Sequence, residues 1–142
     1  MNTWKIKKNA GFSLIELMIV IVIVAILVSL AYPSYVQYVR KSKRGEAQQL
    51  LMNWSINQEI WRSNHTTYAS TGDLPVPIND NYVFITDAGN PPDATSYTLL
   101  ATAQNDQVND KARNGTPCTP LALNSAGRKY SDYDILKTEC WD

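Results

Sequence analysis

The sequence predicts an α+β protein in which a long N-terminal helix packs on a small antiparallel sheet. Three observations lead to this fold class: an apolar run from Phe12 to Ala31, a helical repeat of apolar residues beyond it, and short alternating segments in a second half rich in Asn, Thr, Asp and Pro. A chain of 142 residues has room for one compact domain. We therefore expect a single head domain carried on a long helix.

The run Phe12 to Ala31 is long enough to cross a membrane once. Its 20 residues would span roughly 30 Å at about 1.5 Å per residue, which matches the hydrocarbon core of a bilayer. A cleavable secretory signal peptide would have a shorter apolar region and a small-x-small site after it. Lysines before the run favour an inside N-terminus and an outward-facing head, although basic residues at 40–44 weaken that signal.

Glu16 is unusual because it places a carboxylate inside the apolar run. A charge at the centre of a bilayer costs roughly 2.5 to 3.5 kcal/mol, and less near an end. Ser13 and Glu16 have the S-x-x-E spacing of a capping box, in which Glu16 would return a hydrogen bond to the Ser13 amide. The alternative is that Glu16 pairs with a cation supplied by another group.

The helical pattern continues past Pro33 to about Ser63, where proline should kink the helix without ending it. A helix from Phe12 to Ser63 would be on the order of 75 Å long, too long for a small head to bury alone. Lipid, or the same helix of other subunits, should cover its first half; a single anchor that never polymerises is the simpler alternative. The face expected to pack on the sheet comprises Ala47, Leu51, Trp54, Gln58 and Trp61, with Leu50 beside it.

Strands are predicted after an irregular, proline-containing connector. The candidates are Tyr82–Thr86, Ser96–Ala103 and Thr119–Leu123, followed by a turn at Gly127 into Lys129 and Tyr130. The two cysteines, Cys118 and Cys140, are expected to form one disulfide, because an exported head with two cysteines offers a single pairing. Zinc binding would lack a fourth ligand, and no Cys-x-x-Cys redox motif is present.

The string Gly11-Phe12-Ser13-Leu14-Ile15-Glu16-Leu17 after a Lys-rich leader resembles the class III signal of type IV prepilins. The resemblance implies the type IV pilin fold with its disulfide-closed C-terminal loop. It also implies that a prepilin peptidase cuts between Gly11 and Phe12 on the cytoplasmic face and methylates the Phe12 amine. Glu16 would then pair with the N-terminal amine of a neighbouring subunit. Pro33 matches a proline that the family places in its helix.

Residues 94–99 and 121–127, with Cys118 and the Cys140-Trp141 ending, are similar to minor pilins of the PilE type. This likeness implies a structural subunit, present in few copies, of a pilus that serves twitching motility or adhesion. Its partners would be the major pilin, other minor pilins and the inner-membrane assembly machinery. It would start as an inner-membrane precursor in lipid, with a periplasmic head, and end in an extracellular filament. The expected division is a leader at 1–11, a membrane or filament-core helix at 12–31, an amphipathic helix at 32–63 and the head at 64–142.

Composition argues against catalysis and against nucleic-acid binding. One histidine and no H-E-x-x-H, G-x-S-x-G or phosphate-loop motif leave no assembled catalytic set, so no cofactor, metal or enzyme activity is predicted. From Gly45 onward the sequence has six basic and twelve acidic residues, which gives a net charge of minus six. A DNA-receptor pilin is therefore the less favoured alternative, because acids lie close in sequence to Lys111, Arg113, Arg128 and Lys129. A type II secretion pseudopilin is the other alternative; the two cysteines favour a pilus.

Overall fold

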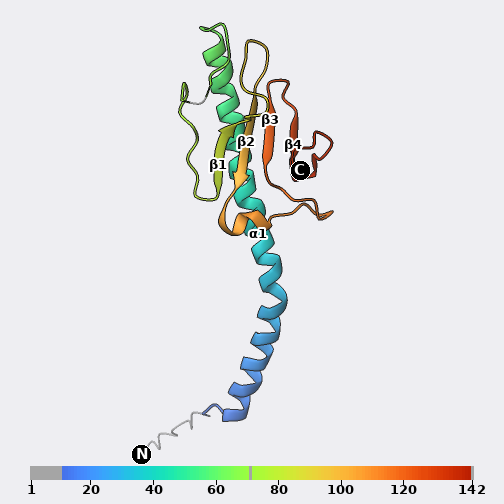
Figure 1. Ribbon diagram of the computed structural model, residues 1–142. Coiled ribbons are helices and arrows are strands. Elements are labelled where there is room, and N and C mark those ends of the chain that lie inside the picture. Colours follow the sequence, from blue (N-terminus) through green and yellow to red (C-terminus); the bar gives the residue numbers. More distant parts are fainter. Residues whose placement is uncertain (1–10, 71, 142) are drawn as a thin grey trace, which may run out of the picture. The chain divides into compact units, whose positions relative to one another are not determined.

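A computed structural model describes residues 11–70 and 72–141; residues 1–10 of the predicted leader 1–11 lie outside these residues. The chain divides into two compact units between Val36 and Gln37. Figure 1 shows helix α1 and strands β1 to β4. The bounds are α1 Leu14–Arg62, β1 Tyr82–Thr86, β2 Thr98–Ala103, β3 Leu121–Asn124 and β4 Lys129–Ser131, with 3-10 turns η1 at Asn105–Asn109 and η2 at Glu139–Trp141.

Helix α1 has 49 residues and contains Pro33 without interruption. Proline lacks an amide proton and breaks one hydrogen bond of the helical ladder, so helical residues on both sides must hold this turn. The helix begins after Ser13, whose Oγ accepts a hydrogen bond from Ile15 N at 3.3 Å. The predicted continuous helix is confirmed within two residues at each end; the predicted kink at Pro33 stays a prediction.

The sheet is antiparallel with strand order β1-β2-β3-β4, so every strand pairs with its neighbour in the chain. Tyr82 lies opposite Ala103 and Phe84 opposite Ala101, which puts these four side chains on one face. This face is buried, whereas Val83 on the other face is partly exposed. The α+β class and the three predicted strands are therefore confirmed, with small shifts at the ends of β2 and β3, and the predicted turn at Gly127 leads into a fourth strand, β4.

The core of the second unit lies between this sheet face and α1. Ala47, Leu51 and Trp54 of the helix are buried with Leu99 and Leu121 of the sheet. The predicted spacing of four and three is correct because it places these helical side chains on one face. The last member of that predicted face, Trp61, is only partly buried. It stacks on His65 instead, with ring centroids 3.8 Å apart.

Candidate functional site

The predicted processing site lies outside the helix. Gly11 and Phe12 precede the first helical residue, and both are exposed. A Cβ added to Gly11 would meet no atom within 4 Å, so the fold of the described residues does not require a glycine here. The segment is sterically open, so a peptidase that requires a residue without a side chain could bind the backbone at Gly11.

Glu16 is exposed in the first turn of α1. Ser13 supplies one half of the expected capping box, because its hydroxyl caps the Ile15 amide. The reciprocal bond from Glu16 to the Ser13 amide is absent among the contacts of residues 11–70 and 72–141. The capping box is therefore only half formed, and the Glu16 carboxylate has no hydrogen bond from it. A cation from outside these residues would neutralise the carboxylate.

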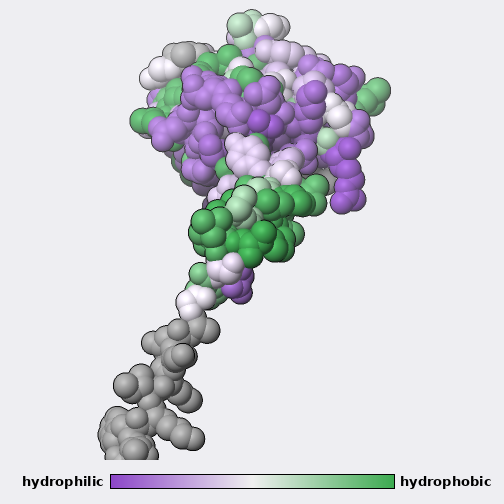
Figure 2. Space-filling model, turned by 90° about the horizontal axis from the view of Figure 1, so that it is seen from below, coloured by the Kyte–Doolittle hydropathy of each residue, from purple (hydrophilic) through white to green (hydrophobic). Residues whose placement is uncertain are grey.

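The first half of α1 is apolar around its whole circumference. It is long and apolar enough to cross a membrane, and none of its most apolar window is buried. Figure 2 shows hydrophobic side chains gathered around this part of the helix, while hydrophilic residues cover much of the visible face of the head. Such a surface requires lipid or other helices around it.

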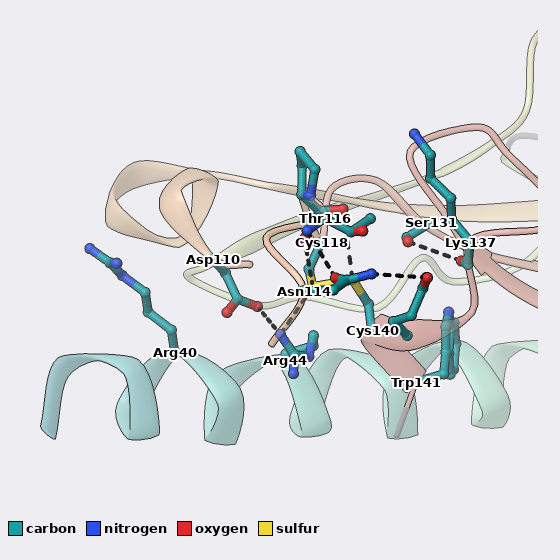
Figure 3. The surroundings of a disulfide bond; sticks show 12 residues. Arg40, Arg44, Asp110, Asn114, Thr116, Cys118, Ser131, Lys137, Cys140 and Trp141 are labelled. Carbon is teal, nitrogen blue, oxygen red and sulfur yellow. Dashed lines mark hydrogen bonds and ion pairs between the residues drawn. A yellow bond between two sulfur atoms is a disulfide. The ribbon is translucent and has the colours of Figure 1, made fainter. Parts of the chain in front are cut away.

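The predicted disulfide between Cys118 and Cys140 is present, with a Cα–Cα distance of 5.5 Å. Both cysteines are fully buried. Helix α1 holds the two ends of the disulfide with side chains one turn apart, as Figure 3 shows in part. Arg44 Nη1 donates to Cys118 Sγ at 3.1 Å, and Gln48 Nε2 donates to the Cys140 carbonyl at 2.7 Å. The disulfide therefore belongs to the interface between helix and sheet.

Arg44 also forms a buried ion pair. Its Nη1 lies 2.7 Å from Asp110 Oδ2, and the two side chains are 6% and 4% exposed. Burial raises the pKa of Asp110, and the Arg44 guanidinium opposes that shift by favouring the carboxylate. One turn earlier, Arg40 pairs with exposed Asp106 through two hydrogen bonds. Bonding to Arg40 lowers the pKa of Asp106.

These pairs change the interpretation of the basic residues in the head. Asp106, Asp110 and Asp132, which were expected to neutralise nearby cations, pair with Arg40, Arg44 and Lys137 respectively. From Gly45 onward, the exposed cations that make no ion pair with any described residue are Lys111, Arg113, Arg128 and Lys129.

Two contacts with η2 lie next to these cations in the sequence. Asn114, which follows Arg113, donates to Glu139 in a hairpin closed by the bridge between Lys111 and Pro117. Lys129, which follows Arg128, lies 5.5 Å from the Trp141 ring centroid. The expected neutralisation by sequence neighbours is therefore incomplete.

Sequence reasoning missed the role of Arg44, although the pattern contains the signal. Positions 44, 47, 51, 54 and 58 follow the same spacing of three and four. Arg44 therefore begins the buried face, and a buried guanidinium requires an acidic partner. The partner, Asp110, lies 66 residues away and could not be chosen from sequence alone.

Residues 6–32 match the model of the prokaryotic N-terminal methylation motif. Combined with the apolar helix, the antiparallel sheet and the C-terminal disulfide, this motif defines the chain as a type IV pilin. Residues 33–122, more than half of the chain, match a family model described as "Type IV minor pilin ComP, DNA uptake sequence receptor". The chain belongs to this family of minor pilins, which confirms the predicted minor pilus subunit.

Two further likenesses are to other pilins. The chain is 32% identical over 108 residues to the "Type IV major pilin protein PilE1" of Neisseria gonorrhoeae, covering 71% of this chain and 64% of that protein. It therefore spans slightly less than two thirds of the length of this relative. A solved type IV pilin from Shewanella oneidensis is 19% identical with a TM-score of 0.47, covering 68% of this chain and 96% of the other.

Proposed function

We propose that the protein is made as a prepilin in the inner membrane, cut between Gly11 and Phe12, methylated at the Phe12 amine and assembled into a pilus through Glu16. Its partners would be a prepilin peptidase, the major pilin, other minor pilins and the inner-membrane assembly machinery. Its head would face the periplasm before assembly, and its role would be structural without catalysis. The observation that carries the proposal is the exposed Glu16 carboxylate, which lies in an apolar helix without a cation among the described residues.

Cleavage would create the missing cation. Removal of the leader frees an amine at Phe12, four residues before Glu16, at the start of the apolar segment. As the helix leaves lipid for the filament, the amine of one subunit and the carboxylate of another can neutralise each other in an apolar environment. An uncompensated carboxylate in the same place would oppose assembly.

Intact-mass and N-terminal analysis tests this proposal on protein from sheared surface filaments and from membranes of the same cells. The expected filament species begins at methylated Phe12 and is lighter by two hydrogens for the disulfide. Its amount relative to the major pilin should be small. Finding only an uncut chain, confined to membranes, would overturn the proposal.

A second candidate function is DNA binding by the head, favoured by the family description as a DNA uptake sequence receptor. Lys111, Arg113, Arg128 and Lys129 would supply phosphate contacts, because their charges are not used in ion pairs with described residues. The acidic balance of the rest of the head would limit binding to this surface. This candidate adds a ligand to the filament subunit and leaves its assembly unchanged.

Fluorescence anisotropy of a labelled duplex with the detergent-solubilised full chain tests DNA binding. Replacing Lys111 and Arg113 with Gln should weaken binding and reduce the slope of log K against log salt by about 0.9 for each phosphate that the variant no longer neutralises. Lys137→Gln is the matched control, because Lys137 already pairs with Asp132. Equal effects of the control and the double variant would argue against this surface.

A further inference from the structure

The two sulfur atoms of the disulfide differ in one contact. Each of them faces a backbone carbonyl: Sγ of Cys118 is 3.8 Å from Thr116 O. Sγ of Cys140 is 3.7 Å from Pro117 O. Sγ of Cys118 also accepts a hydrogen bond from a cation, since Arg44 Nη1 lies 3.1 Å away. Among the described residues, no donor contacts Sγ of Cys140, so the positive charge acts on one sulfur of the pair.

The surrounding head holds the contact between Arg44 and Cys118 in place (Figure 3). Arg44 Nη1 carries two protons, so it donates to Asp110 Oδ2 and to the sulfur at the same time. The Cys118 amide donates to Asp110 O at 3.1 Å, which ties the backbone of the cysteine to the same aspartate. Both ionic side chains are almost fully buried. Moving Cys118 would therefore disturb an ion pair that water cannot replace.

Cys140 lies in the short 3-10 turn η2. This turn has three residues and follows the segment 132–138, which contains no helix or strand. Side-chain hydrogen bonds attach η2 to the rest of the head, from Gln48 to Cys140 O, from Trp141 to Tyr130 O and from Asn114 to Glu139. Local opening at η2 would expose Sγ of Cys140 to a reagent and leave the other sulfur on its guanidinium.

We propose that Cys140 is the site at which an external thiolate exchanges with the disulfide, and that Cys118 is the sulfur released. The thiolate attacks Sγ of Cys140 and forms a new S–S bond there, while the Cys118–Cys140 bond breaks with its electron pair on Cys118. The external thiolate is thereby oxidised to a mixed disulfide, and Cys118 is reduced to a thiolate. Arg44 stabilises the charge on the leaving sulfur, and a stabilised thiolate leaves faster.

Formation of the disulfide follows the same route in reverse, because both directions share one transition state. The Cys118 thiolate, bound by Arg44, attacks the mixed disulfide on Cys140 and releases the external thiolate. The ligand is a thiol, carried by a small molecule or by a cysteine of an oxidoreductase. This exchange takes place in the head and does not require assembly into a filament.

Trapping with glutathione tests the site of exchange. The oxidised full chain in detergent is mixed with reduced glutathione, free thiols are blocked with N-ethylmaleimide after short intervals, and the peptides are identified by mass spectrometry. Chains with glutathione on Cys140 and N-ethylmaleimide on Cys118 should exceed the reverse pattern by about tenfold, because a charged donor stabilises the Cys118 thiolate. Equal amounts of the two patterns, or an excess of the reverse, would overturn the proposal.

A neutral pair separates the charge of Arg44 from its packing. Arg44→Gln combined with Asp110→Asn removes both charges and keeps polar side chains, so the excess should fall to about twofold or less. The matched control is Arg40→Gln with Asp106→Asn, which removes the neighbouring pair on the same helix and should keep the parental excess. Both variants are assayed below their unfolding transitions, so that exchange occurs in the folded head. An unchanged excess in the first variant would refute the role of Arg44.

The variant Cys118→Ala identifies the source of the thiol in cells. It lacks the sulfur that closes the ring, so exchange should stop at a mixed disulfide on Cys140. The mass of this reducible adduct distinguishes a small thiol from a protein. A Cys118→Ala protein without any adduct on Cys140 would contradict the proposed site.

Discussion

Arg44 Nη1 donates to both Asp110 Oδ2, at 2.7 Å, and Cys118 Sγ, at 3.1 Å. One guanidinium therefore connects the helix, the segment after η1 and the disulfide. Because both ionic partners are almost fully buried, their attraction is weakly screened and neither can be hydrated if the other is removed. Arg44 therefore links three parts of the head through one buried group.

Replacing Arg44 with Met should lower the free energy of unfolding of the head by about 3 to 5 kcal/mol, because a buried carboxylate loses its partner. Chemical denaturation of the full chain in detergent, followed by tryptophan fluorescence, measures the loss. The matched control is Arg40→Met, which removes a pair with exposed Asp106 and should cost at most about 1 kcal/mol. Equal losses in the two variants would contradict the distinction between buried and exposed pairs.

Removing the disulfide with Cys118→Ala and Cys140→Ala together should lower the free energy of unfolding by about 3 kcal/mol. The chain-entropy estimate for a separation of 22 residues gives this magnitude. Denaturation curves of the parent and the double variant provide the comparison. A double variant that unfolds at the parent's denaturant concentration would mean that the loop is constrained mainly by its contacts with α1.

Tyr82→Phe should reduce the loss of stability at alkaline pH. Burial raises the pKa of Tyr82 to about 12, whereas the pKa of a tyrosine in the unfolded chain is about 10. The folded state thus keeps a proton that the unfolded state releases, so stability falls as pH rises from about 10 towards 12, by about 2 kcal/mol for this group. Unfolding free energies measured at pH 9 and near pH 12 test the sign.

In the Phe variant, this decline should be smaller by the same amount. Tyr97, whose pKa burial also raises to about 12, contributes equally to both proteins. Tyr133→Phe is the control, because Tyr133 is exposed and its removal should leave the alkaline decline unchanged. An unaltered decline in Tyr82→Phe would argue against a buried, neutral phenol.

Glu16→Ala should leave membrane insertion and cleavage intact but strongly reduce recovery in sheared filaments. The reason is that the incoming amine would lack a carboxylate in the apolar helix bundle. Immunoblots of membrane and sheared fractions measure both quantities. Gly11→Glu is the informative comparison, because it should block cleavage instead; parental incorporation of Glu16→Ala would refute the proposed pairing.

The sequence predicted the helix, three of the four strands and the disulfide because each follows from local pattern or from a single possible pairing. Apolar spacing in 47–58 and alternation in Tyr82–Thr86 reflect which side of an element is buried, and this is a local property. The pairings of Arg44 with Asp110 and Arg40 with Asp106 are different. They join residues 66 positions apart, and only the folded arrangement brings them together.

The charge of the head shows the same limit. Adding nearby charges along the sequence predicted that acids neutralise Lys111 and Arg113. The structure instead pairs Asp106 and Asp110 with helix residues, so sequence proximity was a poor guide to which charges meet.

The attachment of the disulfide to α1 has a mechanical consequence. Tension along a fibre of such subunits would be carried by the helices, and in each head it would pass the pair of Arg40 with Asp106 and then the bonds from Arg44 and Gln48 to Cys118 and Cys140. The force would then act on the loop that the Cys118–Cys140 disulfide closes. It would act on this loop before it reaches the end of a strand, where hydrogen bonds could break one after another. Under pulling, the bonds at the loop would have to fail together, so the head should resist extension more than its small sheet suggests.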